Sequence, residues 1–368
     1  MKKIVYVITL GTWGGAQAHV YDLIKHENGI GNEVWLVTGR SGRLTQQVSN
    51  NFPEVTVVHI PSLHREISPI SDIQTVAKLR KLFRHISPDI VHVHSAKGSV
   101  VGRLAAIGIS PIVYTVHGWA FTVGVKRVRA FIAVIIEKFL QPFTAQYICV
   151  SKFDYRLGRA KGLMNIKHPG IVIHNGVQQQ AGIKEQVNRS SFRIVMAARF
   201  AEPKRQDLLI DAVSKIKEPN IELVLLGEGP QKSSCEQLAQ KLGVSEKVFF
   251  EGSVSNVQEY YINADIVALI SNYEALPISL VEALATSKAI VASNVGGINE
   301  IVTDNGLLVE NNSAVIANAI EQLYQDKSRL ARMNENSVIN YENGFKSEQM
   351  LKKTQSIYEQ IYKEEVPD

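Results

Sequence analysis

Two glutamates separated by seven residues stand where a buried strand would pass into a helix. Glu274 follows the apolar run at 264–270, and Glu282 lies inside a helix pattern that starts with Pro277 in its first turn. An ionised carboxylate only accepts hydrogen bonds, and it can accept two from a sugar diol. The backbone N–H groups at a helix start attract anions such as phosphate. These groups together would suit a nucleotide-sugar, whereas a solvated loop Glu and an ordinary helical ion pair are the plain alternative.

Two other groups of residues could hold phosphates. Gly14 and Gly15 lie where a first strand passes into a helix, so the backbone could approach a phosphate closely, although a simple tight turn would explain them equally well. They do not fit the dinucleotide fingerprint Gly-x-Gly-x-x-Gly. Arg199 and Lys204 flank a loop after a later strand, and such a pair of cations suits a diphosphate. Basic loop residues on a solvated surface are the alternative for this pair.

Three histidines occupy strand positions or strand ends. His117 follows a buried strand and precedes Gly118, so it could hydrogen-bond a ligand or be a satisfied structural histidine. His92 and His94 alternate on a strand and share one of its faces. A metal site would need a third ligand, and the sequence offers none nearby, so we expect no metal.

Residues 125–140 combine a basic start with a broad apolar face. Lys126, Arg127 and Arg129 open the segment, and apolar residues dominate the rest. Such a helix can lie in a membrane interface and attract anionic lipid. A helix that packs on the core and has a solvated end is the other interpretation.

The chain has 368 residues, of which 45% are hydrophobic and 20% charged, a globular composition with enough length for two domains. No apolar run approaches the ~20 residues that cross a bilayer, and Met1 leads directly into a strand-like segment without a signal peptide. We therefore expect a cytoplasmic protein. Cys149 and Cys235 give neither a metal spacing nor a disulfide framework.

The two halves of the chain differ in charge. Residues 1–180 contain 21 Lys and Arg, 9 Asp and Glu and all 10 His, whereas the remainder contains 19 basic and 26 acidic residues. A basic half could meet a phosphorylated acceptor, an anionic membrane surface or nucleic acid. A solvated surface that binds no partner would also account for the difference.

Strand-like and helix-like segments alternate, which is typical of parallel α/β sheets. We expect most of the unusual residues at the carboxyl ends of strands, where ligands bind in such sheets. The predicted fold is two doubly wound, Rossmann-like domains facing each other across a cleft. Its expected parts are a first domain over 1–176, a linker over 177–190, a second domain over 191–345 and a final helix over 346–368, with helices among others over 16–24, 71–86 and 125–140.

Seven motifs in order make the chain resemble the retaining glycosyltransferases of family 4, which have the GT-B fold. The third motif departs from the family pattern, because Gln178 stands where an acidic residue often follows. In this fold the last helix usually crosses back to the first domain. The motifs are Gly14-Gly15, Tyr114 to Gly118, Ile173 to Val177, Arg199 to Lys204, Gly227 to Pro230, Glu274 to Glu282, and Val295 to Gly297.

The resemblance implies roles for the matching residues. Arg199 and Lys204 would bind the donor diphosphate and stabilise the charge of the leaving group. Glu282 would hold the ribose, and Glu274 would contact hydroxyls of the donor sugar instead of acting as a nucleophile. His117 would line the sugar pocket. The remaining implied donor-binding residues are Gly14, Gly15, Asn175, Gly227, Gly229, Ala275, Leu276, Pro277 and Ile278.

The implied reaction is hexosyl transfer from a nucleotide-sugar, for which we expect a UDP-sugar. It would pass through an oxocarbenium-like state with retention and without a covalent intermediate. Arg and Lys take the role that a divalent cation has elsewhere, so no metal and no other cofactor is expected. The text at 115–122 is similar to bacterial enzymes that build capsule, exopolysaccharide or cell-wall polysaccharide on a polyprenyl diphosphate.

A lipid-linked acceptor would fit the basic first domain and the 125–140 segment. We therefore expect a peripheral protein at the inner face of the plasma membrane. The candidate contacts to acceptor or membrane are Lys126, Arg127, Arg129 and His94.

Other activities on the same fold remain open, namely a UDP-sugar epimerase, a phosphorylase and a non-catalytic nucleotide-sugar sensor. The ordered Arg, Lys and Glu-x7-Glu set disfavours the epimerase. A nucleic-acid binder would need stacking aromatics beside its basic residues, yet aromatics are only 7% of the chain and do not cluster with them.

Overall fold

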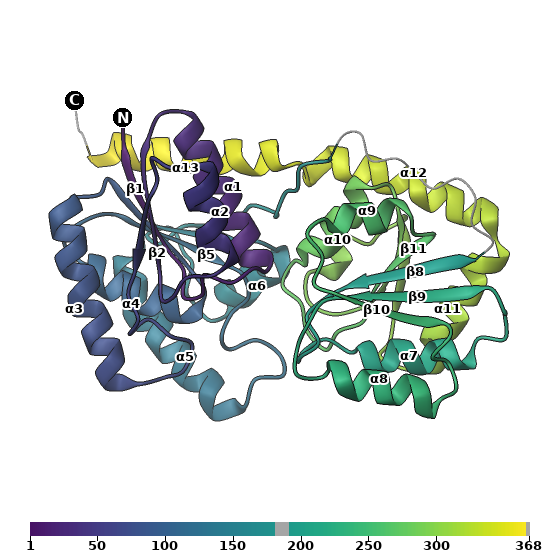
Figure 1. Cartoon of the computed structure of the whole chain (residues 1–368). Coiled ribbons are helices and arrows are strands. Elements are labelled where there is room, and N and C mark those ends of the chain that lie inside the picture. The colour runs from purple at the N-terminus through teal and green to yellow at the C-terminus, as the bar shows by residue number, and fades with distance from the viewer. Residues whose placement is uncertain (181–190, 366–368) are drawn as a thin grey trace. The chain divides into compact units, whose positions relative to one another are not determined.

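The computed structural model describes residues 1–180 and 191–365, which form two compact units (Figure 1). The first unit is Met1–His174 together with the C-terminal segment from Ser347, and the second is Asn175–Lys346. The boundary thus lies two residues before the border of 176 that the sequence suggested. Each unit has a wholly parallel sheet with helices on both faces, as predicted from the alternating pattern.

The sheet of the first unit has seven strands in the order β3-β2-β1-β4-β5-β6-β7. Every paired strand is parallel, and the chain reverses its direction of winding between β1 and β4. The strands are β1 (Lys3–Val7), β2 (Glu33–Thr38), β3 (Thr56–His59), β4 (Ile90–His94), β5 (Ile112–Val116), β6 (Gln146–Cys149) and β7 (Gly170–Val172).

Alternating side chains of these strands build a core on each face of the sheet. On β1, Tyr6 packs among Val20 and Leu23 of α1, whereas Val5 packs on the other face with Phe83 of α3. The first face carries α1 (Gly15–Gly29), α2 (Arg43–Asn51) and α13 (Ser347–Glu365), and the second carries α3 (Pro69–Ile86), α4 (Ala96–Ala106), α5 (Arg127–Leu140), the short η1 (Gln141–Phe143) and α6 (Lys152–Ala160).

The C-terminal helix α13 packs on the first unit, as the resemblance implied. Its buried residues Met350, Ile357, Tyr358 and Ile361 recur at helical spacing and join the core of α1 and β1. The Tyr358 hydroxyl lies 3.3 Å from that of Tyr6 and also hydrogen-bonds Nδ1 of His92. Helix α13 therefore packs on the sheet that carries His92 and His94.

The second unit repeats this plan with six strands in the order β10-β9-β8-β11-β12-β13, and its winding reverses between β8 and β11. Helices α7, α8 and α11 cover one face, and α9, α10 and α12 cover the other (Figure 1). The elements are β8 (Phe192–Ala197), α7 (Gln206–Lys215), β9 (Ile221–Leu226), α8 (Lys232–Lys241), β10 (Val248–Gly252), α9 (Val257–Ile262), β11 (Ile266–Leu269), α10 (Ile278–Ala285), β12 (Ala289–Ser293), η2 (Ile298–Glu300), β13 (Gly306–Val309), α11 (Ser313–Gln325) and α12 (Lys327–Gly344).

Several helix starts differ from the predictions. Helix α3 begins at Pro69 after Ser68 instead of being capped by Ser71, because proline suits the first helical position. Pro277 is the residue before α10 and does not lie in its first turn. Helix α5 begins at Arg127, two residues after the expected start. Strand β13, the α-helices α2, α11 and α12, and the short helices η1 and η2 were not predicted.

The first residues of the predicted linker are fixed to the second unit. Val177 forms a bridge with Lys346, and its carbonyl oxygen accepts a hydrogen bond of 2.9 Å from the Tyr341 hydroxyl. The Gln258 amide donates to the carbonyl oxygen of Gln178 at 2.9 Å. Residues 181–190 of the predicted linker lie outside the described residues.

Candidate active site

Two loops of the second unit are joined where the order of its strands reverses. The backbone of Lys204, on the loop after β8, pairs with that of Ser271, on the loop after β11. The N–H of Arg205 donates to the carbonyl oxygen of Ile270 at 2.9 Å, and the N–H of Asn272 donates to that of Pro203 at 2.8 Å. These bonds fix the backbone from which the Lys204 and Glu274 side chains extend.

Lys204 and Glu274 form an ion pair in which the ammonium hydrogen-bonds Oε1 of the carboxylate. The two side chains are only 18% and 11% exposed, so the pair is largely shielded from water. A carboxylate has about four acceptor positions, and the pair therefore leaves Glu274 capacity for hydroxyl groups. Arg199, on the same loop as Lys204, is exposed. Sequence reasoning named all three residues but did not predict the ion pair.

Glycines allow neighbouring loops to approach the loops that carry Lys204 and Glu274. Gly296 has φ +57°, and a Cβ there would lie 1.7 Å from the carbonyl oxygen of Glu274. Gly229 has φ +156°, and its Cβ would lie 2.3 Å from the carbonyl oxygen of Phe200. Gly227 is packed in the same way against the loop after β8. These motif glycines are thus required by the packing of the loops.

Helix α10 begins beside Glu274. Its first residue Ile278 follows the buried stretch of Ala275, Leu276 and Pro277, and the Asn175 amide donates to the carbonyl oxygen of Leu276 at 2.9 Å. Pro277, the residue before the helix, has no side chain that caps it, so the first N–H groups of α10 can face an anion.

Glu282 lies half-buried in the second turn of α10. Tyr261 of α9 is buried near it, and burial and then the charge of Glu282 raise the pKa of the Tyr261 hydroxyl well above its ordinary value. Sequence reasoning missed Tyr261. The one signal for it was an aromatic residue in the short helix before β11.

In the first unit, the glycines before α1 differ in whether packing requires a glycine at their position. A Cβ at Gly11 would lie 2.3 Å from the carbonyl oxygen of Arg40, so packing requires glycine there. Gly14 is extended and precedes Gly15, the first residue of α1. A Cβ at Gly14 would meet only the end of the flexible Gln17 side chain, at 3.0 Å. The packing of the fold therefore does not demand glycine at Gly14.

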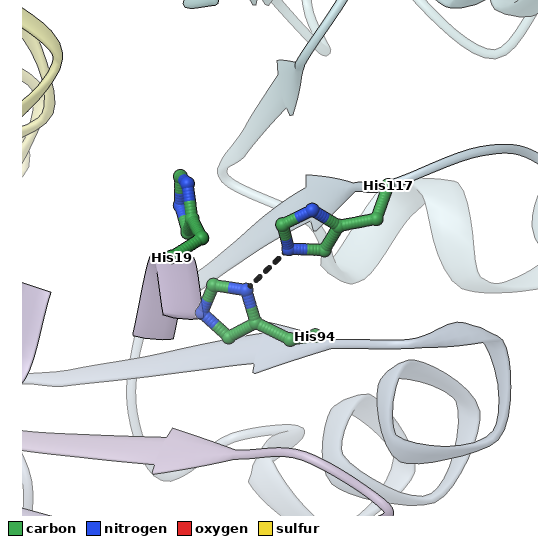
Figure 2. Close-up of side chains that lie close together, drawn as sticks. All are labelled: His19, His94 and His117. Carbon is green, nitrogen blue, oxygen red and sulfur yellow. Dashed lines mark hydrogen bonds between the residues drawn. The ribbon is translucent and has the colours of Figure 1, made fainter. Parts of the chain in front are cut away.

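Three histidines from three elements converge at the carboxyl ends of β4 and β5 (Figure 2). His94 ends β4, His117 directly follows β5, and His19 lies in α1. Nδ1 of His94 and Nε2 of His117 are 3.1 Å apart in a hydrogen bond, and the rings of His19 and His117 meet edge to face at 4.9 Å. Sequence reasoning missed His19, whose signal was its place just after the glycine loop.

Burial disfavours the charged form of two imidazoles in this cluster. Burial, followed by neighbouring imidazoles, lowers the pKa of His94 and of His117 well below the ordinary value. Burial likewise lowers the pKa of His92, which shares a face of β4 with His94 as predicted, the two rings lying 4.2 Å apart. His94 is fully buried, so it does not lie on the surface with the basic residues of α5, with which it had been grouped as a candidate acceptor contact.

Trp119 anchors the loop that carries His117. Its indole N–H donates to the carbonyl oxygen of Asp154 at 2.7 Å, and Asp154 itself accepts from the Ser151 hydroxyl at the start of α6. Gly118, between His117 and Trp119, has φ +116°, which glycine adopts without strain. The position of the His117 ring therefore depends on the start of α6.

Helix α5 exposes most of its apolar face. Its buried or half-buried residues include Ala133, Glu137 and Leu140, whereas Phe131 and Phe139 are 68% and 63% exposed. The core-packing interpretation of the whole segment is thus wrong for this face. Other exposed residues of the region include Val123, Lys126, Arg127, Val128, Arg129, Ile132, Ile135, Ile136 and Lys138.

Comparison with known proteins covers both units. Residues 13–180 match the family model described as Glycosyltransferase Family 4, and residues 178–338 match that described as Glycosyl transferases group 1. The Escherichia coli O-antigen biosynthesis glycosyltransferase WbnH is 30% identical over 357 residues, which cover 94% of this chain and 99% of that protein. The chain belongs to the group 1/family 4 glycosyltransferases. It is a glycosyltransferase of polysaccharide biosynthesis.

A further relative and two solved structures are also similar to this glycosyltransferase. An Escherichia coli protein named UDP-Gal:alpha-D-GlcNAc-diphosphoundecaprenol alpha-1,3-galactosyltransferase is 27% identical, over 97% of this chain and 96% of its own. Anabaena HepE, solved in complex with UDP and glucose, has a TM-score of 0.82 at 21% identity and is matched over 98% of this chain and all of its own. The sucrose-phosphate synthase of Thermosynechococcus elongatus has a TM-score of 0.86 at 19% identity, over 98% and 99% of the two chains. The likeness to these structures shows the GT-B fold.

Proposed function

We propose that this glycosyltransferase moves a hexosyl group from a UDP-sugar to a saccharide carried on a polyprenyl diphosphate, with retention at the anomeric carbon. The observation that carries the proposal is the shielded Lys204–Glu274 pair beside the open start of α10. A cation, a carboxylate and free N–H groups in one place match a diphosphate joined to a sugar. The named substrates of the Escherichia coli galactosyltransferase support the choice of donor and acceptor class.

Each residue then has a part in binding the donor. Arg199 and Lys204 bind the diphosphate, Glu282 binds the ribose and Glu274 accepts hydrogen bonds from the sugar. Lys204 occupies only part of the acceptor capacity of the Glu274 carboxylate, which leaves positions for the sugar hydroxyls. Gly14 and Gly15 bring backbone to the phosphates, and His117 contacts the sugar, which a neutral imidazole can do as donor or acceptor.

The transferase reaction proceeds without a metal or another cofactor in this proposal. The bond between the anomeric carbon and the diphosphate breaks, and negative charge develops on the leaving oxygen. The ammonium of Lys204, the guanidinium of Arg199 and the N–H groups of α10 stabilise that charge. The acceptor hydroxyl attacks from the same face and loses its proton to the departing phosphate, so configuration is retained.

The test is a screen of nucleotide-sugars with the purified protein and a synthetic polyprenyl-diphosphate saccharide. With one labelled UDP-sugar we expect label in the lipid-linked product and free UDP, with the new bond in the configuration of the donor. An inverted bond would contradict retention. Epimerisation of the donor without acceptor, or tight binding without turnover of any donor, would overturn the transferase assignment.

We further propose that α5 holds the enzyme at the inner face of the plasma membrane. Among the described residues no helix combines the length and the apolar character needed to cross a bilayer. The exposed apolar face of α5, flanked by Lys126, Arg127 and Arg129, is the arrangement of an interfacial helix. A helix held at the membrane would also bring the enzyme to an acceptor whose lipid is anchored there.

Replacing both Phe131 and Phe139 with Ser should weaken binding to vesicles of phosphatidylglycerol and phosphatidylcholine by roughly tenfold or more, because apolar area leaves the interface. Cosedimentation measures the effect. The matched control replaces Val338 and Ile339, which are exposed on α12 of the second unit, and should bind like the wild type. Equal vesicle binding by both variants would contradict the role of α5.

Replacing Gly296 with Ala should lower kcat/KM for transfer by about 100-fold, because the new Cβ must displace the Glu274 backbone from a position 1.7 Å away. The control is Gly344→Ala at the end of α12, where a Cβ meets nothing within 4 Å. Steady-state kinetics with saturating acceptor measure both. Normal kinetics in Gly296→Ala would show that the Glu274 position does not matter for transfer.

A further inference from the structure

The histidine cluster contains a group that the fold leaves unsatisfied. Nε2 of His94 is buried and has no hydrogen-bond partner among residues 1–180 and 191–365. His92, two residues earlier on β4, differs because its Nδ1 bonds the Tyr358 hydroxyl and its Nε2 bonds the Thr115 hydroxyl at 2.7 Å. A buried ring nitrogen without a partner is uncommon and points to a missing ion or water.

The geometry of the cluster suits a metal ion. His19, His94 and His117 each offer one ring nitrogen, and the three nitrogens all lie within 4.8 Å of one another. In a tetrahedral zinc site with bonds of about 2.0–2.1 Å, ligand nitrogens are roughly 3.3 Å apart. Nδ1 of His94 lies 3.1 Å from Nε2 of His117, so the two rings are already close, and the His94 ring would turn to present its unsatisfied Nε2 to the ion. Small rotations of the rings would bring the three nitrogens around one ion.

The three imidazole side chains select the class of metal. Imidazole prefers Zn²⁺, Co²⁺, Ni²⁺ and Cu²⁺, whereas Mg²⁺ and Ca²⁺ prefer oxygen ligands.

We propose that His19, His94 and His117 bind one transition-metal ion such as Zn²⁺ and leave a fourth coordination position open. Occupation of the site draws the His117 ring toward the metal and away from the donor sugar, and so inhibits transfer. The inhibition rests on the proposed function, because it requires that His117 contact the donor. The binding of the ion rests on the cluster alone.

Metal uptake is measured with the untagged, EDTA-treated full-length protein. Titration with Co²⁺ should give the intense visible absorption of a four-coordinate site, with one equivalent bound, and Zn²⁺ should remove that absorption stoichiometrically. Excess Mg²⁺ should leave it unchanged. Absence of the band, or a weak six-coordinate spectrum, would overturn the site.

Variants assign the ligands. The single changes His19→Gln, His94→Gln and His117→Gln should each weaken Co²⁺ binding by more than ~100-fold, since even loss of a residue that supports a metal ligand costs 10- to 100-fold. His92→Gln, a buried histidine of the same strand whose ring nitrogens are both occupied, should retain the band. Far-UV circular dichroism checks that each variant is folded. Retention of the band in a folded His19→Gln or His117→Gln variant would overturn the assignment.

Transfer assays separate this proposal from the proposed function. EDTA-treated enzyme should be fully active, saturating Zn²⁺ should abolish transfer, and added EDTA should restore it. Transfer that is unaffected by bound Zn²⁺ would overturn the inhibition. Stoichiometric Co²⁺ binding by a protein that transfers no sugar would overturn the proposed function and leave the metal site standing.

Discussion

Replacing Lys204 with Ala is expected to lower kcat for sugar transfer by roughly 100- to 1000-fold, the usual cost of removing one donor to a developing charge. In the proposed mechanism its ammonium faces the diphosphate as the bond to the sugar breaks. The structure adds a second reason, because Lys204 is the ionic partner of the shielded Glu274 carboxylate. Its loss would leave that carboxylate without its cation and shift the residue that contacts the sugar.

Companion variants separate these two effects. Lys204→Arg keeps the charge but changes its shape, and should recover part of the rate. Lys204→Ala combined with Glu274→Gln removes both charges, so it should recover stability but not turnover. Lys215→Ala is the control, since its ammonium pairs with Asp211 at the exposed side of α7, and transfer should be unchanged. Wild-type turnover in Lys204→Ala would contradict the assignment of the active site.

The second large effect concerns the buried ion pair of the first unit. Arg103 of α4 is completely buried and bonds Glu137 of α5 at 2.7 Å, and its guanidinium also donates to the carbonyl oxygen of Ser99 and lies over the Tyr114 ring. Arg103→Met should lower the free energy of unfolding by about 3–5 kcal/mol, because it leaves the Glu137 carboxylate buried without its cation. Urea denaturation measures the loss.

The same experiment includes a rescue and a control. Arg103→Met with Glu137→Leu should recover most of the stability, because replacing both charges with apolar side chains is often neutral. Lys2→Met breaks a pair with Asp89 whose side chains are 39% and 34% exposed, and should cost less than about 1 kcal/mol. Equal destabilisation by Arg103→Met and by the double variant would show that lost packing, not the uncompensated charge, causes the effect.

The Arg103–Glu137 pair also determines which face of α5 is turned toward α4. Glu137 turns one face of the helix toward α4, and this leaves Phe131 and Phe139 exposed. From sequence, the same apolar and basic pattern allowed either core packing or a membrane interface. The pattern gives the width of an apolar stripe, but not which part of it a neighbouring helix will cover.

The fold could be predicted from the sequence because the sequence patterns that indicate it are local. Apolar runs of strand length, helical spacing and glycines at fixed places predicted the parallel sheets, and the order of seven motifs indicated GT-B. Elements with weak local signals were missed. Helix α2 is largely polar and buries only Leu44, Thr45 and Val48, so its few apolar contacts did not reveal it.

The candidate site residues could be predicted from the sequence for the same reason, whereas the residues that they contact could not. The sequence by itself determined that Glu274, Arg199, Lys204 and His117 follow the ends of strands and that Glu282 lies inside a helix, because the spacing of residues fixes those places.

The tertiary structure alone decided that Lys204 is the partner of Glu274, seventy residues away in the chain, and that His19 and His117 join His94. Parallel strands bring distant segments to one edge of a sheet, and that placement depends on the strand order, which no local pattern encodes. For this reason the sequence paired His94 with His92 on one strand and offered no third ligand nearby, whereas the folded chain places His19 of α1 and His117 from the end of β5 beside His94.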